Sequence, residues 1–370
     1  MAAARGSPVV AQARRSDAQL WQAVHVVRQH GGNVSAASRQ TGIPLGTLSH
    51  QIRDAQGRFG ADVLTRALED APGDFTVAEL PSAVPTADEL LEARRKAYAR
   101  KSQAAEAREL VPIAIHLDGP IGIMHGGDPH LDDDGTDIAL VERHVAIVRG
   151  CAGLLGANVG DYSNNWIGRL AHLYSQQTTS AREALVLVEW FIRSMRWLYL
   201  IGGNHDAWSG DGDPVAWFAR QSNSLYQQHG ARLALTFPNG RTLRINARHD
   251  FKGHSQWNTA HGPAKAASMG WRDHILACGH THVSGYQVLK DPSTGLISHA
   301  LRISSYKKHD RYAAQLGLPN QDIFCAPVTI IDPRFADDDP RLVTVIFDPE
   351  PAAEYLTWLR AKSARGSRKR

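Results

Sequence analysis

Residues 121–130 read IGIMHGGDPH, so a short apolar run ends in two glycines and is followed by an aspartate and a histidine. Residues 154–161 (LLGANVGD) and 197–206 (WLYLIGGNHD) are likewise apolar runs that end in glycine followed by polar residues. Stretches with helical spacing of apolar residues lie between these runs, at about 137–149 and 181–196. This alternation predicts a layered α/β domain with crossover connections, whose ligand site lies at the carboxyl ends of the strands.

Two more predicted strands end in polar residues. A hairpin over residues 232–247 turns at Pro238-Asn239-Gly240, a typical tight-turn sequence, and leads to His249. Residues 275–282 read ILACGHTH, an apolar run followed by two histidines. Five strand ends therefore present one set of candidate ligands: Asp128, His130, Asp161, Asn204, His249, His280 and His282.

These side chains are carboxylates, an amide and imidazoles, with no thiolate. They suit two divalent ions, Mn²⁺ first and otherwise Fe²⁺, Ni²⁺ or Zn²⁺, better than a structural zinc. Asp128 and His130 are two residues apart, as are His280 and His282, so on extended backbone each pair points to one side. Two ions about 3.5–4 Å apart need a bridging carboxylate, for which Asp161 is the candidate.

The sequence resembles the calcineurin-like metallophosphoesterase family over about residues 112–350. The resemblance rests on five patterns that occur in the family's order: D-x-H, G-D, G-N-H-D, H and G-H-x-H. The resemblance implies a two-sheet αββα sandwich and a dinuclear metal centre. It assigns one ion to Asp128, His130, Asp161 and His282, and the other to Asp161, Asn204, His249 and His280.

The sequence departs from the family pattern at two points. Residues 160–165 read GDYSNN, without the second acid of the family's G-D-x-x-D. Asn164 or Asn165 would contact a phosphate or simply form a turn. The common His-Gly of the fourth pattern is His249-Asp250 here, and we expect His249 to be the ligand and His254 to line the pocket.

The chemistry expected of such a centre is attack of a metal-activated hydroxide on phosphorus. His205 follows the candidate ligand Asn204 and is the candidate acid that protonates the leaving oxygen. Asp206 would orient His205 and raise its pKa. In the alternative interpretation, His205 only packs in a capped turn. A general acid favours diesters or poorly activated monoesters as substrates.

The first part of the chain predicts three short helices between residues 16 and about 60. Residues 32–48 (GNVSAASRQTGIPLGTL) resemble the helix-turn-helix of bacterial and phage DNA-binding proteins. The candidate contacts to base edges or phosphates are Thr47, His50, Gln51 and Arg53. The alternative is a small helical bundle that binds protein.

The predicted organisation has five parts: a disordered start (1–15), a helix-turn-helix-like domain (16–70), a linker with a charged helix (71–110), a metallophosphoesterase-like domain (111–358) and a basic tail (359–370). Three widely spaced cysteines argue against disulfides and for a cytoplasmic protein. No signal peptide or membrane-spanning stretch is predicted.

The parts together favour a phosphodiesterase or nuclease that acts on nucleic acid, DNA more than RNA, and they suggest a phage or mobile-element setting. A phosphatase or diesterase for a small nucleotide or a phosphoprotein is the first alternative. The second alternative is a DNA-binding regulator whose phosphoesterase domain is a non-catalytic scaffold. The net charge of +4 arises largely from the basic C-terminus, which supports the nucleic-acid hypothesis only together with the other parts.

Overall fold

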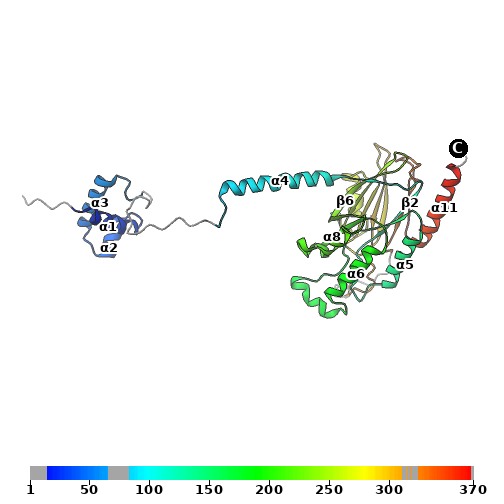
Figure 1. Cartoon of the computed structure of the whole chain (residues 1–370), viewed down its shortest axis with the longest axis horizontal. Coiled ribbons are helices and arrows are strands. Elements are labelled where there is room, and N and C mark those ends of the chain that lie inside the picture. Colours follow the sequence, from blue (N-terminus) through cyan, green and yellow to red (C-terminus); the bar gives the residue numbers. More distant parts are fainter. Residues whose placement is uncertain (1–14, 66–82, 311–313, 315–316, 318–323, 368–370) are drawn as a thin grey trace, which may run out of the picture. The chain divides into compact units, whose positions relative to one another are not determined.

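The structure is a computed structural model that describes residues 15–65, 83–310, 314, 317 and 324–367. The expected disordered start and most of the predicted linker lie outside these residues. The chain divides into two compact units, one up to Thr86 and the other from Ala87 (Figure 1). None of the helices in the described part of the chain combines the length and hydropathy of a membrane span. All three cysteines are buried free thiols.

The first unit consists of three helices: α1 (Asp17–Arg28), α2 (Val34–Thr41) and α3 (Leu45–Phe59). Ser16 forms the N-cap of α1, as part of a capping box with Gln19. Gly42 ends α2 in the left-handed conformation, with φ 73°. The helices enclose a small apolar core: Leu20, Ala23, Val24, Val27, Ala37, Leu48, Ile52, Ala55 and Val63. The three predicted helices are therefore confirmed.

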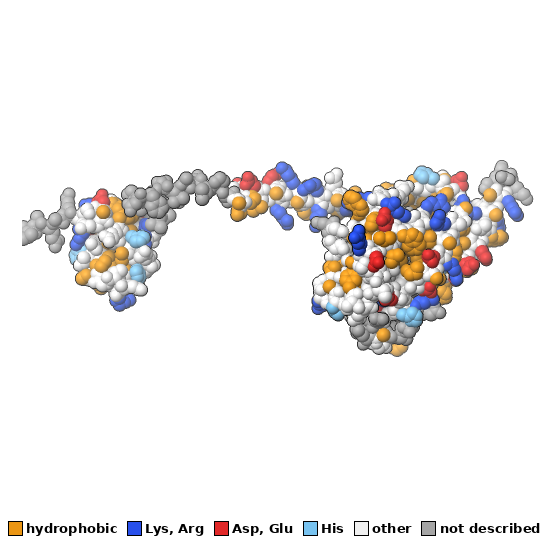
Figure 2. All heavy atoms as spheres, turned by 60° about the horizontal axis from the view of Figure 1, so that its bottom comes forward, with side chains coloured by type: hydrophobic (Ala, Val, Ile, Leu, Met, Phe, Trp, Pro, Cys, Tyr) orange, Lys and Arg blue, Asp and Glu red, His pale blue; other side chains and the backbone are white. Residues whose placement is uncertain are grey.

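The second unit begins with α4 (Ala87–Glu109), the predicted charged helix. It buries none of its residues. Acidic, basic and apolar side chains follow one another along its surface (Figure 2). Glu92 pairs with Arg95 at 3.6 Å and with Lys96 at 3.4 Å, and such exposed pairs contribute only a few tenths of a kcal/mol each.

Two mixed six-stranded sheets form the body of this unit. In spatial order, the first sheet contains β1 (Val111–Ala114), β6 (Gly230–Thr236), β7 (Thr242–Arg248), β8 (Ile275–Cys278), β10 (Ile297–Arg302) and β9 (Gly285–Lys290). The second sheet contains β12 (Val343–Ile346), β11 (Val328–Ile331), β2 (Ile121–Gly126), β3 (Leu154–Asn158), β4 (Trp197–Gly202) and β5 (Leu225–Gln228). β2 to β5 are parallel, and β6 and β7 form the predicted hairpin.

One apolar cluster joins the facing sides of the two sheets, and includes Ile123 and Ile201 of the second sheet and Leu233 and Ile245 of the first. The other side of the second sheet is covered by α5 (Ile138–Gly150), α6 (Ala181–Ser194), α8 (Pro214–Ala219) and α11 (Pro349–Ser367). α9 (His261–Met269) packs on the outer side of β8, β9 and β10. The unit is thus a layered α/β structure with two sheets at its centre.

The C-terminal boundary differs from the prediction. The helix α11 continues to Ser367, so most of the segment expected to be a basic tail is helical. Leu356 is fully buried, Leu359 packs against the same core, and the Arg360 guanidinium donates to the carbonyl of Pro120 at 2.5 Å. These contacts extend the helix beyond the point at which charge alone predicts disorder.

Candidate metal centre

The loops after β2, β3, β4, β7 and β8 bring histidines and aspartates together. His130, Asp161 and His205 have ligand atoms within 4.8 Å of one another, and so do Asp161, His249 and His280. Asp161 belongs to both groups. A carboxylate that bridges two ions needs such a position. These groups can hold metal ions. The short elements α7 (Asn204–Ala207), η2 (Gly168–Gln176) and η3 (Gly210–Gly212) lie in the loops of this region.

His249 is the most closely connected of these side chains. Its Nε2 lies 2.8 Å from Asn204 Oδ1, 3.0 Å from His280 Nδ1 and 3.3 Å from Asp161 Oδ2. Its Nδ1–H donates to the carbonyl of Val159 at 2.9 Å, which fixes the ring and directs Nε2 at the cluster. The hairpin strand therefore delivers His249 to the other predicted ligands.

Asp128 and His130 contain buried polar atoms that have no hydrogen-bond partner in the described part of the chain. Asp128 Oδ2 accepts from the His280 N–H at 2.6 Å, but Oδ1 accepts no hydrogen bond, and neither ring nitrogen of His130 has one. Such buried atoms cost free energy unless an unseen partner satisfies them. A divalent cation suits a carboxylate oxygen and an imidazole nitrogen, so these residues fit a metal.

The structure corrects the expected backbone at the ligands. Asp128, His130, His280 and His282 were predicted on extended backbone, but they have φ of 45°, 38°, 72° and 53°, and Asp161 has φ of 53°. Non-glycine residues seldom adopt this left-handed region, and each such residue costs roughly 1–3 kcal/mol. The pairs still face one site, because turns rather than strands orient them.

Burial keeps several imidazoles neutral. It lowers the pKa of His130 well below its usual value, with help from His205 and His282. It also lowers the pKa of His282 to about 4, and that of His280, which the neighbouring His249 lowers further. Neutral imidazoles carry the lone pair that a metal requires. Burial also lowers the pKa of His249, but Asp161 and Asp128 outweigh it and raise that pKa to about 10.

Asp206 does not orient His205, so that prediction is wrong. Its Oδ2 accepts from the N–H groups of Asp161 at 2.9 Å and Gly203 at 2.8 Å, and its Oδ1 accepts from Tyr162 N–H at 3.3 Å. The α7 turn directs the carboxylate inward, toward the loop after β3. Burial and the nearby charge of Asp161 raise the pKa of Asp206 to about 8. Asp206 therefore braces the loop that carries Asp161.

His205 is held by a backbone carbonyl instead. Its Nδ1–H donates to the carbonyl of Asn164, and its ring centroid lies 4.1 Å from that of Trp208 and 5.3 Å from that of Trp166. Its Nε2 lies 3.9 Å from Asp161 Oδ2, and the side chain is 13% exposed. The ring is thus fixed, with Nε2 beside the ligand cluster.

The predicted substrate contacts make structural bonds. Asn164 is fully buried, and its Nδ2 donates to Asp133 at 2.8 Å and to Gln177 at 3.0 Å. Asn165 donates to the His205 carbonyl at 2.6 Å. These bonds favour the alternative in which the asparagines form turns. His254 is exposed, and the described metal-ligand groups do not include it.

Arg302 is a residue of this region that sequence analysis missed. It is 3% exposed and donates to Asp250 Oδ1 at 3.1 Å, to the Gly279 carbonyl at 2.8 Å and to Thr281 Oγ1 at 3.0 Å. It therefore braces the turn that carries His280 and His282. The arginine between the apolar residues Leu301 and Ile303 is the signal that could have found it.

Comparisons with known proteins add little to this geometry. No protein-family model matches the chain, and no curated protein is similar to it. Among solved structures, the chain is similar to the nuclease MPE of Pseudomonas putida, with 14% sequence identity, 60% of this chain and 87% of that chain covered, and a TM-score of 0.29. A TM-score this low supports no conclusion about activity, so a functional proposal depends on the residues of the site.

Proposed function

We propose that the second unit is a dinuclear, metal-dependent phosphoesterase of the calcineurin-like type. The observation that carries this proposal is Asp161, which lies within ligand distance of both histidine groups. The unpartnered buried atoms of Asp128 and His130 support it, since a cation satisfies them at little cost. One ion would be held by Asp128, His130, Asp161 and His282, with His205 of the first group kept as the acid and not as a ligand, and the other by Asp161, Asn204, His249 and His280.

The chain's own residues prepare the site for phosphate chemistry. Two bound divalent ions supply an acidified water and withdraw charge from the phosphate. Asp161 holds its carboxylate between the two groups because Asp206 fixes its backbone. His205 stands beside them, and the Asn164 carbonyl fixes Nδ1–H so that Nε2 can transfer a proton to a leaving oxygen. Trp166 and Trp208 limit the motion of this ring.

The substrate class we propose is a phosphodiester of nucleic acid, DNA more than RNA. The first unit supports this choice, because Thr47, His50 and Arg53 are exposed along α3, and Gln51 is half-buried beside them. An exposed helix face with hydrogen-bonding and cationic side chains suits a DNA groove. In this proposal, the first unit holds DNA and the second unit cleaves a phosphate ester.

The test compares hydrolysis of bis(p-nitrophenyl) phosphate and p-nitrophenyl phosphate with Mn²⁺, in the native chain and in Asp161→Ala and His205→Ala. We expect diester turnover, its loss in Asp161→Ala, and only a small reduction in His205→Ala, because p-nitrophenolate leaves with little need of a proton; the reduction by about 10²–10⁴ is expected for DNA, whose leaving group is an alkoxide. His172→Ala is the matched control for His205, since His172 lies on η2 and is exposed. Monoester preference would favour a phosphatase, and no turnover with any of the four metals would favour the regulator.

A second experiment tests the nucleic-acid part. Binding of labelled double-stranded DNA to the full chain is measured over a salt series, with Arg53→Ala beside Arg39→Ala on α2. We expect the logarithm of the binding constant to fall linearly with the logarithm of salt concentration, and Arg53→Ala to lower the binding constant more than Arg39→Ala. Equal binding by both variants and the native chain would contradict DNA contact by α3.

A further inference from the structure

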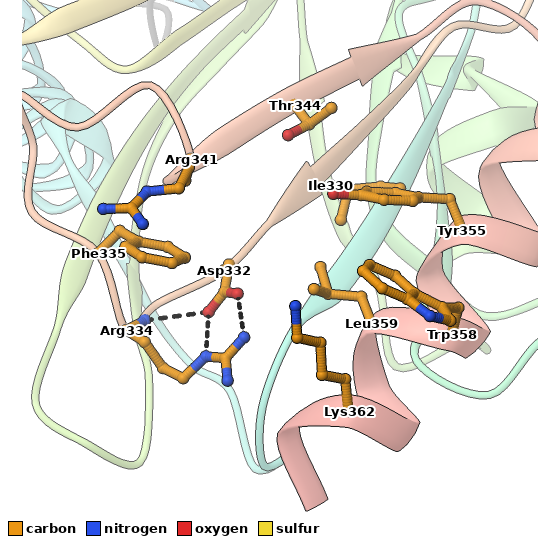
Figure 3. Close-up of a pocket in the computed structure, with 10 residues that line it drawn as sticks. All are labelled: Ile330, Asp332, Arg334, Phe335, Arg341, Thr344, Tyr355, Trp358, Leu359 and Lys362. Carbon is orange, nitrogen blue, oxygen red and sulfur yellow. Dashed lines mark hydrogen bonds and ion pairs between the residues drawn. The ribbon is translucent and has the colours of Figure 1, made fainter. Parts of the chain in front are cut away.

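A pocket lies at the end of the second sheet opposite the candidate metal centre. β11 runs antiparallel to β2, with Ile331 opposite Ile121, so the chain after β11 emerges at the start of β2. The metal-centre residue Asp128 follows the end of β2 instead. The pocket has a volume of about 420 Å³, within the range of small-molecule sites. It is lined by β11 and the residues after it, by β12 and by the middle of α11 (Figure 3).

One wall of the pocket is aromatic. Tyr355 and Trp358 project from α11 toward the strands, and their rings are nearly parallel, with centroids 5.6 Å apart (Figure 3). Trp358 is 53% exposed, with Tyr355 beside its ring and the flexible end of Lys362 over it, so a ligand ring reaches Trp358 when Lys362 turns toward the phosphate. Ile330 and Leu359 provide an apolar floor between this wall and the opposite side. Such a surface suits a planar ring, because stacking needs no particular hydrogen-bond pattern.

The opposite side and the rim carry three cations. Arg334 forms two bonds to buried Asp332, and Arg341 forms two to Asp339, so each arginine is neutralised along one edge. The third cation is Lys362, whose Nζ lies 4.9 Å from the Trp358 ring centroid. The described residues form no ion pair with Lys362. The pocket therefore has one excess positive charge, next to the aromatic wall.

We propose that this pocket binds a nucleotide, with its base stacked on Trp358 and its phosphate held by Lys362 and the free Nη1 edge of Arg334. A planar ring and an anion at short separation are the features that the two sides of the pocket recognise. Arg334 is held rigid by Asp332, so it loses little freedom when it binds phosphate. The site is separate from the metal centre and does not depend on the phosphoesterase activity.

Isothermal titration calorimetry of the full chain tests this proposal. The probes are dAMP and single-stranded d(A)8, with EDTA present so that no metal-dependent hydrolysis occurs. Trp358→Ala and Lys362→Gln should each weaken binding about tenfold, and Trp358→Phe should retain most of it. The matched controls are Trp217→Ala, at a 62% exposed tryptophan on α8, and Arg365→Gln, one turn beyond Lys362 on α11. Both controls should bind dAMP within twofold of the native chain.

The two probes distinguish the source of the nucleotide. Binding of dAMP that requires Trp358 and Lys362 identifies a free nucleotide, whereas such binding of d(A)8 alone identifies a unit of a strand. The proposal is overturned if neither probe binds, or if both pocket variants bind as tightly as the native chain. Turnover of bis(p-nitrophenyl) phosphate with Mn²⁺ should be the same in Trp358→Ala and the native chain. Its absence from the native chain would refute the phosphoesterase and leave the pocket untouched.

Discussion

Replacing Asp206 should weaken metal binding without removing any ligand. The Asp206 carboxylate is 3% exposed and accepts three backbone N–H bonds, two of them from the segment that carries Asp161. The third comes from Gly203, which precedes Asn204. Asp206 therefore ties together the turns after β3 and β4, both of which contribute predicted ligands.

The cost of two substitutions follows from these bonds. Asp206→Ala leaves three buried N–H groups without an acceptor, at roughly 1–3 kcal/mol each, so we expect a loss of about 3–5 kcal/mol after local relaxation. Asp206→Asn can keep its oxygen at the Oδ2 position and retain the bonds to Asp161 and Gly203. It would lose only the longest bond, at 3.3 Å to Tyr162, for about 1–2 kcal/mol.

The assay measures Mn²⁺ affinity by calorimetry and stability by urea unfolding. We expect metal affinity to fall about 10–100-fold in Asp206→Ala and less in Asp206→Asn. Asp213→Ala is the control, because Asp213 is 6% exposed and its carboxylate caps α8 through Val215 and Ala216, whereas the Asp206 carboxylate bonds the segment that carries Asp161. It should lower stability with native metal affinity. A folded Asp206→Ala with native Mn²⁺ affinity would refute this reasoning, as would an equal loss of affinity in Asp213→Ala.

Three other changes test neighbouring parts of the structure. Gly203→Ala would place a Cβ 2.6 Å from Asp161 N and should abolish turnover, whereas Gly150→Ala, with no atom within 4 Å, should leave it intact. Arg302→Met should lower the free energy of unfolding by about 3–5 kcal/mol, measured in urea, and weaken Mn²⁺ binding. Native Mn²⁺ affinity in this variant would show that the turn at 279–282 keeps its conformation without Arg302. Burial lowers the pKa of His125 to about 3, so the unfolded chain binds its proton first as pH falls below about 6.5. Stability should therefore drop by about 2 kcal/mol from pH 7 to 5 on account of this residue, and His125→Gln should show a smaller drop.

Much of the second unit could be predicted because its strands have simple local signals. The runs at 121–126, 154–158 and 197–202 are apolar, short and bounded by glycine, and they form β2, β3 and β4. Parallel strands bring their carboxyl ends to one edge, so the order of the chain alone brings Asp128 and Asp161 together. The hairpin turn at Asn239-Gly240 extends the same reasoning to the other sheet.

The rest depends on contacts between residues distant in sequence. The strands β11 and β12 follow a stretch of sequence that has no regular spacing of apolar residues. The pairing of β11 with β2 joins positions more than 200 residues apart. The continuation of α11 past residue 358 depends on packing of Leu356 and Leu359 in the core beside the second sheet. The basic residues after Leu359 hide the helical spacing of the apolar residues before them. Their charge therefore predicts a disordered tail, whereas burial of the apolar residues maintains a helix.

The error about Asp206 shows why adjacent residues are poor guides to roles within a site. In sequence, His205-Asp206 looks like an imidazole and its orienting carboxylate. In the α7 turn, however, successive side chains point about 100° apart, so His205 faces the ligand cluster while Asp206 faces the backbone of Asp161. The positive φ of Asp161 then needs an external brace, because the left-handed backbone is not favoured by the residue itself. Asp206 stabilises this backbone through two hydrogen bonds. The positions of the candidate metal ligands therefore depend on two turns that are bonded to each other, and no single sequence motif fixes them.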